Sequence, residues 1–172
     1  MPHKDGTLKA REFLFFCEDL AMAGLPAGFP RPERRVMWTI LQMHYGNPDV
    51  HVELQPHVGR GMVELGLHLE GPAEQNDRWA AVVGERAPEM IAALGPEWEL
   101  EDWTSSWRRL HRVFRFDKLT TALGHEVADD CTKALMAFHP LLAEAGGVYV
   151  PPPERPHSTG KGWRERRRAA RR

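Results

Sequence analysis

Three consecutive stretches of the chain alternate between apolar and polar residues, which is the period-2 pattern of β-strands whose two faces differ. They span residues 36–45, 50–57 and 62–70. The segments between them, Gly-Asn-Pro-Asp at 46–49 and Gly-Arg at 59–60, contain residues that favour turns. Pairing the strands about these turns sets Leu41 opposite Leu54 and Leu54 opposite Leu65, so these leucines share one apolar face.

The opposite face of this predicted sheet carries histidine and glutamate. Side chains alternate along a strand, so every second residue from His51 to His57 and from Glu64 to Glu70 falls on this face. Two rows across the strands then read His44–His51–His68 and Gln42–Glu53–Gly66. The plain interpretation is a polar face turned to water or to a partner, as antiparallel sheets commonly have.

Three further segments have the apolar spacing of amphipathic helices. They cover residues 7–23, 72–94 and about 120–144. Thr7 is the predicted cap of the first helix. Pro88 predicts a kink or break near Ala87 in the second, and Pro140 predicts a distorted final turn in the third.

A second hairpin is predicted for residues 97–103 and 107–116. Opposite charges at directly facing positions stabilise a hairpin register by roughly 0.2–1 kcal/mol per pair. The register that achieves this has the pairs Trp103–Trp107, Asp102–Arg108, Glu101–Arg109 and Leu100–Leu110.

The elements follow the order α-β-β-β-α-β-β-α, which predicts one α+β domain at residues 1–147 with helices packed on the apolar face of an antiparallel sheet. This order resembles the type III secretion chaperone-like fold over roughly residues 7–145. Members of that fold are small, often dimeric binding proteins, so the resemblance implies a binding module. It rests on the order of elements alone and transfers no functional residue.

Charge is distributed unevenly along the chain, although the net charge of the 172 residues is only −1. Residues 151–172 carry +6, against −7 for the residues before them. We predict a Pro-rich linker and a disordered Arg-rich tail at 148–172, a composition that binds polyanions through counterion release. The candidate nucleic-acid contacts of this tail are Arg164, Arg166, Arg167, Arg168, Arg171 and Arg172.

The cysteine content and the N-terminus predict a cytoplasmic protein. Cys17 and Cys131 are the only cysteines, and both fall on apolar helix stripes rather than in a disulfide or metal spacing. No stretch approaches the roughly 20 apolar residues that a membrane span requires, so no membrane partner is expected.

The histidine row is the one place where the sequence suggests chemistry. Neighbouring strand positions bring Cβ atoms within roughly 5 Å, close enough for two imidazoles to share a metal. A first shell suited to zinc or another divalent metal would combine His44, His51 and His68 with Glu53 or Glu70. A water molecule on such a metal is activated for hydrolysis at neutral pH.

Apolar residues on the same face favour a different function. Trp38, Ile40 and Met62 lie among the histidines and carboxylates, which is more typical of a docking surface than of a solvated face. The sequence therefore favours a non-enzymatic binding or adaptor protein with a protein partner or a second copy of itself, no required cofactor, and a tail able to contact nucleic acid. The alternative is a metal-dependent hydrolase with the histidine site.

Overall fold

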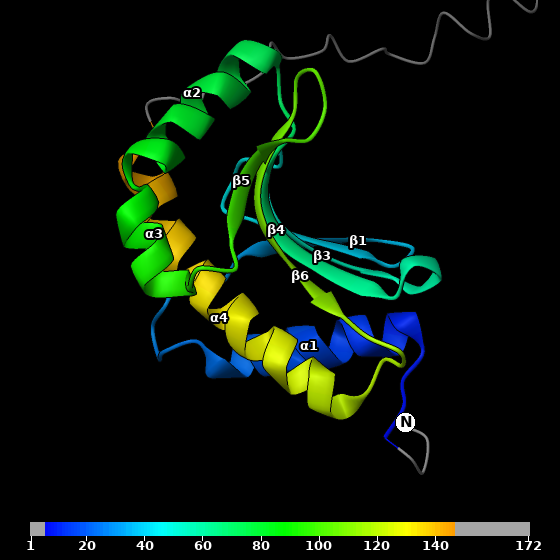
Figure 1. The fold of residues 1–172 in the computed structure, drawn as a ribbon. Coiled ribbons are helices and arrows are strands. Elements are labelled where there is room, and N and C mark those ends of the chain that lie inside the picture. Colours follow the sequence, from blue (N-terminus) through cyan, green and yellow to red (C-terminus); the bar gives the residue numbers. More distant parts are fainter. Residues whose placement is uncertain (1–5, 147–172) are drawn as a thin grey trace, which may run out of the picture.

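The computed structural model describes residues 6–146, which form one six-stranded antiparallel sheet with helices on one side (Figure 1). The strand order across the sheet is β1-β2-β3-β4-β6-β5. The strands are β1 (Glu33–Met37), β2 (Ile40–His44), β3 (Val50–His57), β4 (Met62–Leu69), β5 (Glu99–Asp102) and β6 (Arg108–Arg115). A short 3-10 helix, η1 (Val58–Arg60), connects β3 to β4. The α+β class is thus confirmed.

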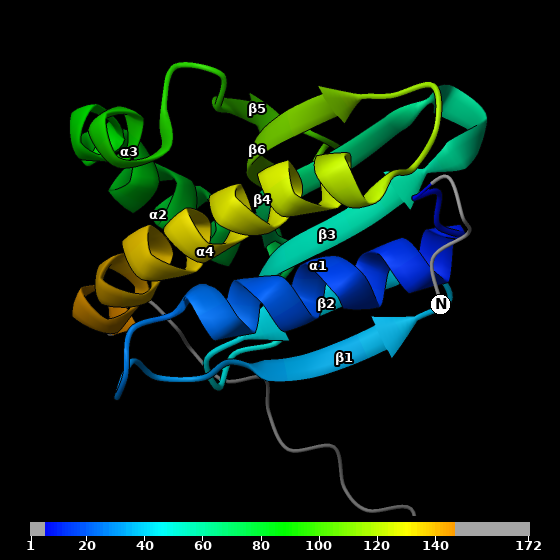
Figure 2. The same cartoon turned by 90° about the horizontal axis from the view of Figure 1, so that it is seen from below.

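Four α-helices cover the outer side of the strongly curled sheet, and its inner side faces away from them (Figure 1). The helices are α1 (Ala10–Gly24), α2 (Ala73–Glu85), α3 (Ala87–Leu94) and α4 (Thr121–Glu144). From below, α1 and α4 lie side by side over the sheet, while α2 and α3 lie towards one end (Figure 2). We call the helix-covered side the convex face and the opposite side the concave face.

The convex face forms the hydrophobic core. Leu41, Leu54 and Leu65, which the sequence aligned in one row, are completely buried. They pack with Phe13 of α1 and Phe138 of α4 in the same cluster. Burying each such side chain contributes about 1.5–3 kcal/mol, so this face provides most of the driving force for folding.

The predicted strand registers are confirmed. Leu41 pairs with Leu54, and His51 pairs with His44 on one side and His68 on the other. In the second hairpin, Glu101 pairs with Arg109 as the charge pattern predicts. These registers are readable from sequence because a short turn fixes which residues face each other, and the period of two fixes the side on which each lies.

The stretch 36–45 was predicted as one strand, but it contains the end of β1, a tight turn and β2. β1 ends at Met37 and β2 begins at Ile40, with Trp38 and Thr39 as the turn. Trp38 has a φ of 55°, a conformation that favours glycine and that a bulky residue rarely adopts. The turn contains no glycine, proline, asparagine or aspartate, so the sequence did not reveal it. The sheet therefore has one strand more than predicted.

The helix predictions hold with changes at the ends. The first helix begins at Ala10 rather than after a cap at Thr7, because Thr7 forms a β-bridge with Thr120. The predicted break is confirmed at Arg86, with Pro88 in the first turn of α3. The last helix continues through Pro140 to Glu144.

Residues 148–172, for which a linker and tail are predicted, lie outside the described part of the chain, and so do the six tail arginines. Within residues 6–146, no helix has the length and apolarity needed to cross a membrane.

Candidate functional site

One row of side chains runs across all six strands on the concave face. The register links position 33 on β1 to position 101 on β5 through β2, β3, β4 and β6. The row reads Glu33, His44, His51, His68, Arg109 and Glu101. Three consecutive histidines and an arginine thus lie between two glutamates, and the facing Arg109 and Glu101 carry opposite charges that stabilise their pairing.

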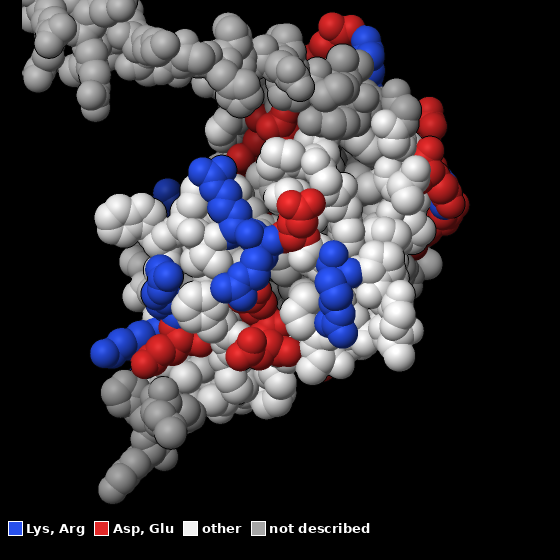
Figure 3. All heavy atoms as spheres, turned by 180° about the vertical axis from the view of Figure 1, so that it is seen from behind, with Lys and Arg blue, Asp and Glu red and all other residues white. Residues whose placement is uncertain are grey.

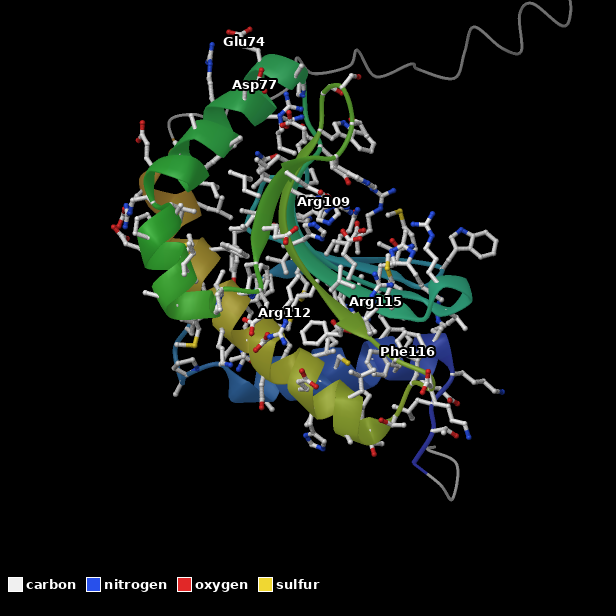
Figure 4. The ribbon with its side chains drawn as sticks, viewed as in Figure 1. Glu74, Asp77, Arg109, Arg112, Arg115 and Phe116 are labelled. Atoms are coloured by element: carbon white, nitrogen blue, oxygen red, sulfur yellow. The ribbon has the colours of Figure 1, made fainter. Side chains whose placement is uncertain are left out.

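The middle of this row is buried, which corrects the prediction of a polar face turned to water. His51 is 2% exposed and His68 is 1% exposed. The ring of Trp103, in the β5–β6 connection, packs edge-on against His68 with centroids 5.3 Å apart. The Arg109 guanidinium lies over the same Trp103 ring, 5.1 Å from its centre. Figure 4 shows Arg109 on the concave side and Arg112, three residues further along β6, directed towards α4.

Three buried side chains and one partly exposed one converge on a common point between β3 and β4. His51, Glu53, His68 and Glu70 each offer one ligand atom, and these atoms lie within 4.8 Å of one another. Nε2 of His51 is 3.5 Å from Oε2 of Glu53 and 3.9 Å from Oε2 of Glu70. Nδ1 of His68 is 3.1 Å from Oε1 of Glu70. We call these four residues the His–Glu cluster.

The His51 ring is held by the turn that precedes β3. Its Nδ1 lies 2.8 Å from the carbonyl oxygen of Pro48. A carbonyl oxygen only accepts hydrogen bonds, so Nδ1 must carry the proton and donate it. Nε2 is buried and has no hydrogen-bond partner. In the neutral ring this nitrogen therefore presents a lone pair to two carboxylates.

The His68 ring lies between two carboxylates. Nδ1 is 3.1 Å from Glu70, and Nε2 is 3.1 Å from Oε1 of Glu64. Burial alone would lower the pKa of His68, but these two hydrogen bonds outweigh it and raise the pKa to about 9. In the absence of another cation, this ring is an imidazolium.

Glu64 connects the cluster to the second hairpin. Its Oε1 accepts from Nη1 of Arg109 at 2.6 Å, and Nε of Arg109 donates to Oε1 of Glu101 at 2.6 Å. Although burial would raise the pKa of Glu64, His68, Arg109 and His111 lower it to about 2. For His111, burial and the nearby Arg109 charge both lower the pKa. The concave face thus stays buried because its charges are paired.

Glu53 of the His–Glu cluster is held in place by a glutamine on the neighbouring strand. Its Oε2 accepts from Nε2 of Gln42 at 3.0 Å. Burial would raise the pKa of this carboxyl, but His51, His68 and Gln42 hold it below its ordinary value. Glu53 therefore carries a negative charge 3.5 Å from Nε2 of His51.

The structure brings four of the five predicted metal ligands together and leaves out the fifth. His44 lies beside His51 in the backbone register, yet it is not part of the His–Glu cluster. Sequence reasoning missed Glu64 as a partner of His68, and it interpreted Arg109 only as a hairpin residue. The contact between Glu64 and Arg109 depends on the pairing of β4 with β6. Helices α2 and α3 lie between these strands in the sequence, so no short turn fixes their register.

The predicted partner surface lies at one end of the sheet. Trp38 is 87% exposed at the β1–β2 turn, whereas Ile40 and Met62 are half-buried on the adjoining strands. Continuing the β2–β3 register brings this turn level with His57, so it lies beside η1. Val58 in η1 is also exposed. We call this end of the sheet the tip.

Near the tip, three arginines have no carboxylate partner among residues 6–146. Arg35, Arg60 and Arg115 are exposed, and within residues 6–146 none of them forms an ion pair. Arg115 instead points its Nη1 to the sulfur of Met62 at 3.8 Å. Elsewhere, basic and acidic side chains are interspersed, as the view from behind shows (Figure 3).

A scan against protein-family models and searches of curated proteins and of solved structures found no match to this chain. The function must therefore be argued from the side chains themselves.

Proposed function

We propose that this protein is a non-enzymatic binding protein that docks an acidic segment of a partner protein at the tip. The observation that carries the proposal is Trp38, an indole 87% exposed on a residue with a φ of 55°. A bulky residue in this conformation costs of order 1–3 kcal/mol, and such strain concentrates at functional positions. A glycine would form the same turn without that cost.

The composition of the tip supports a protein partner. Tryptophan, methionine and arginine are enriched at the centres of protein interfaces, and tryptophan and arginine carry much of the binding energy. The tip offers Trp38 with Ile40 and Met62 as the apolar part. A single aromatic among aliphatic side chains suits a peptide better than a run of nucleic-acid bases, which need several stacking rings.

The charge of the tip points to acidic residues in that partner. Arg60 and Arg115 have no carboxylate partner within the described residues, so their charges are available to another chain. Rim charges of this kind accelerate association and select against partners of like charge. The carbonyl of Trp38 accepts from Nη1 of Arg11 at 2.9 Å, which holds the turn in place against α1.

The hydrolase alternative is supported less well. A catalytic metal keeps a position open to water and substrate. Here His51, Glu53 and His68 are buried, and only Glu70, with a side chain 17% exposed, reaches towards solvent. Such burial favours a structural role for the cluster.

Selection of short random peptides on the full-length protein tests the proposal. We expect enriched peptides to combine Asp or Glu with apolar residues. Trp38→Gly should weaken their binding on the order of 30-fold, as loss of a hot-spot residue does. Arg60→Ala with Arg115→Ala should mainly slow association and flatten its salt dependence.

Two exposed side chains away from the tip serve as matched controls. Met136→Ala on α4 and Arg78→Ala on α2 should leave peptide binding unchanged. Peptides without acidic bias, or binding that survives Trp38→Gly, would contradict the proposal. So would tip-dependent binding to single-stranded RNA or anionic vesicles, or a dimer that Trp38→Gly dissociates, since each assigns the tip another occupant.

A further inference from the structure

We infer that the His–Glu cluster is a binding site for one divalent transition-metal ion, with zinc the best match to its donors. The inference is independent of the tip and of its partner. It rests on the distances between donor atoms, the proton positions that their hydrogen bonds impose, and the second layer of residues around them.

The separations between the donor atoms fit a single ion. Zinc bonds to imidazole nitrogen and carboxylate oxygen at about 2.0–2.2 Å, which sets tetrahedral ligand atoms roughly 3.4 Å apart. The pairs His51–Glu53, His51–Glu70 and His68–Glu70 are separated by 3.5, 3.9 and 3.1 Å. All four ligand atoms lie within 4.8 Å of one another, so closing them onto one ion takes side-chain shifts of about 1 Å or less and no change of the backbone.

The His51 tautomer is the one that metal ligation requires. Its Nδ1 proton is donated to the Pro48 carbonyl, which leaves the Nε2 lone pair free. Nε2 belongs to a side chain 2% exposed and has no hydrogen-bond partner. A buried acceptor directed at two carboxylates is unfavourable, because lone pair and anions repel each other. A cation at the common point satisfies all three groups.

His68 has a carboxylate behind it in the position that metal-binding histidines use. With Nε2–H donated to Glu64 at 3.1 Å, Nδ1 offers its lone pair on the side of Glu70. Most ligating histidines donate their other N–H to a carboxylate or a backbone carbonyl, which fixes the ring and strengthens the donor. His51 uses a carbonyl in this way and His68 uses Glu64.

The carboxylate behind His68 is itself held in place. Arg109 binds Glu64 at 2.6 Å and bridges it to Glu101. On the other side, Gln42 donates to Glu53 at 3.0 Å. Three of the four ligands thus have a second-layer partner that orients them, which is the arrangement expected of a built site rather than a chance cluster.

The donor set indicates the class of metal. Imidazole with carboxylate suits zinc and other first-row divalent ions, whereas calcium and magnesium prefer oxygen donors alone. Four protein donors complete a tetrahedral shell, so the ion would be structural. It would join β3 to β4 where the middle of the concave row is buried.

Elemental analysis of the untagged, full-length protein tests the site. We expect about one zinc ion per chain to remain after gel filtration in a zinc-containing buffer. His51→Gln and Glu70→Gln should each lower metal affinity by at least 100-fold. Glu64→Gln, which removes only the carboxylate behind His68, should lower it 10- to 100-fold.

His44→Gln is the matched control, because His44 lies next to His51 on the same face but outside the cluster. It should leave the metal content unchanged. Equal loss in this control and in His51→Gln would overturn the assignment, as would a wild-type chain that retains no metal.

Cobalt substitution gives a readout that does not depend on any variant folding. Addition of Co²⁺ to the chelator-treated wild-type protein should produce the intense visible absorption of a tetrahedral cobalt site, saturating at one ion per chain. Zinc should then displace it. The weak spectrum of hydrated cobalt at every ratio would overturn the inference.

Discussion

Both faces of this sheet have a buried centre, but for opposite reasons. On the convex face, Leu54 and its neighbours are buried by contact with helices, which removes apolar surface from water. On the concave face, His68 and Glu64 are buried among charges that neutralise one another. The free energy gained by apolar burial grows with the buried area, whereas a buried charge is stable only when each of its partners is present.

The largest expected effect comes from breaking a pair on the concave face. Arg109→Met leaves Glu64 buried without its guanidinium, and we expect the free energy of unfolding to fall by about 3–5 kcal/mol. Urea denaturation measures this loss. The double variant Arg109→Met, Glu64→Met should recover only part of it, because no unpaired carboxylate remains but Nε2 of the buried His68 loses its acceptor.

The exposed Arg78–Glu74 pair on α2 is the control for that experiment, and Arg78→Met there should cost less than about 1 kcal/mol. A similar cost for Arg109 and Arg78 would show that the concave charges are no more coupled than surface ones.

The convex face should respond in proportion to the volume removed. Leu54→Ala deletes completely buried atoms, and we expect a loss of about 2–5 kcal/mol in the same assay. Leu100→Ala on β5 is the comparison, since Leu100 is 43% exposed and should change stability little. Equal effects at the two positions would argue against the packing of the convex face.

Between pH 2 and 9, the pH dependence of stability should come from the concave face. With metal chelated, His68 has a folded pKa of about 9 against an ordinary value of 6.5. The contribution of His68 to the free energy of unfolding is complete below pH 6.5 and is lost as pH rises through about 9. Glu64 has a folded pKa of about 2 against 4.5, so its contribution is present above 4.5 and is lost as pH falls towards 2.

Urea unfolding across this range should therefore show a maximum between pH 4.5 and 6.5. His68→Gln should remove the alkaline decline and weaken the acid limb without abolishing it, because Arg109 still lowers the pKa of Glu64. A profile that is flat from pH 6.5 to 9 in the wild-type protein would contradict the charge pairing described here.

The smallest expected effect lies at the tip, which belongs to neither buried face. Trp38→Gly should raise the free energy of unfolding by roughly 0–2 kcal/mol, because relief of a strain of order 1–3 kcal/mol is partly offset by the greater freedom of glycine in the unfolded chain. Thermal melting provides the measurement. A lower melting temperature would mean that the indole stabilises the fold, and would weaken the argument that Trp38 is kept for binding.

Local signals in the sequence were sufficient for much of the architecture. The turns at 46–49 and 59–60 fixed the β2–β3–β4 register, and facing charges fixed that of β5 and β6. The turn at Trp38 was missed because its residues carry no turn preference. The β4–β6 pairing was missed because the two intervening helices leave no register to read.

The sequence by itself determined which residues share a face and which face one another across β2, β3 and β4. It could do so because strand periodicity and turn length are local properties. Only the tertiary structure decided that the concave face is buried, that Glu64 and Arg109 support His68, and that His44 stands apart from the cluster. Those outcomes depend on the curl of the sheet and on strands paired at long range, which set distances that no local pattern encodes.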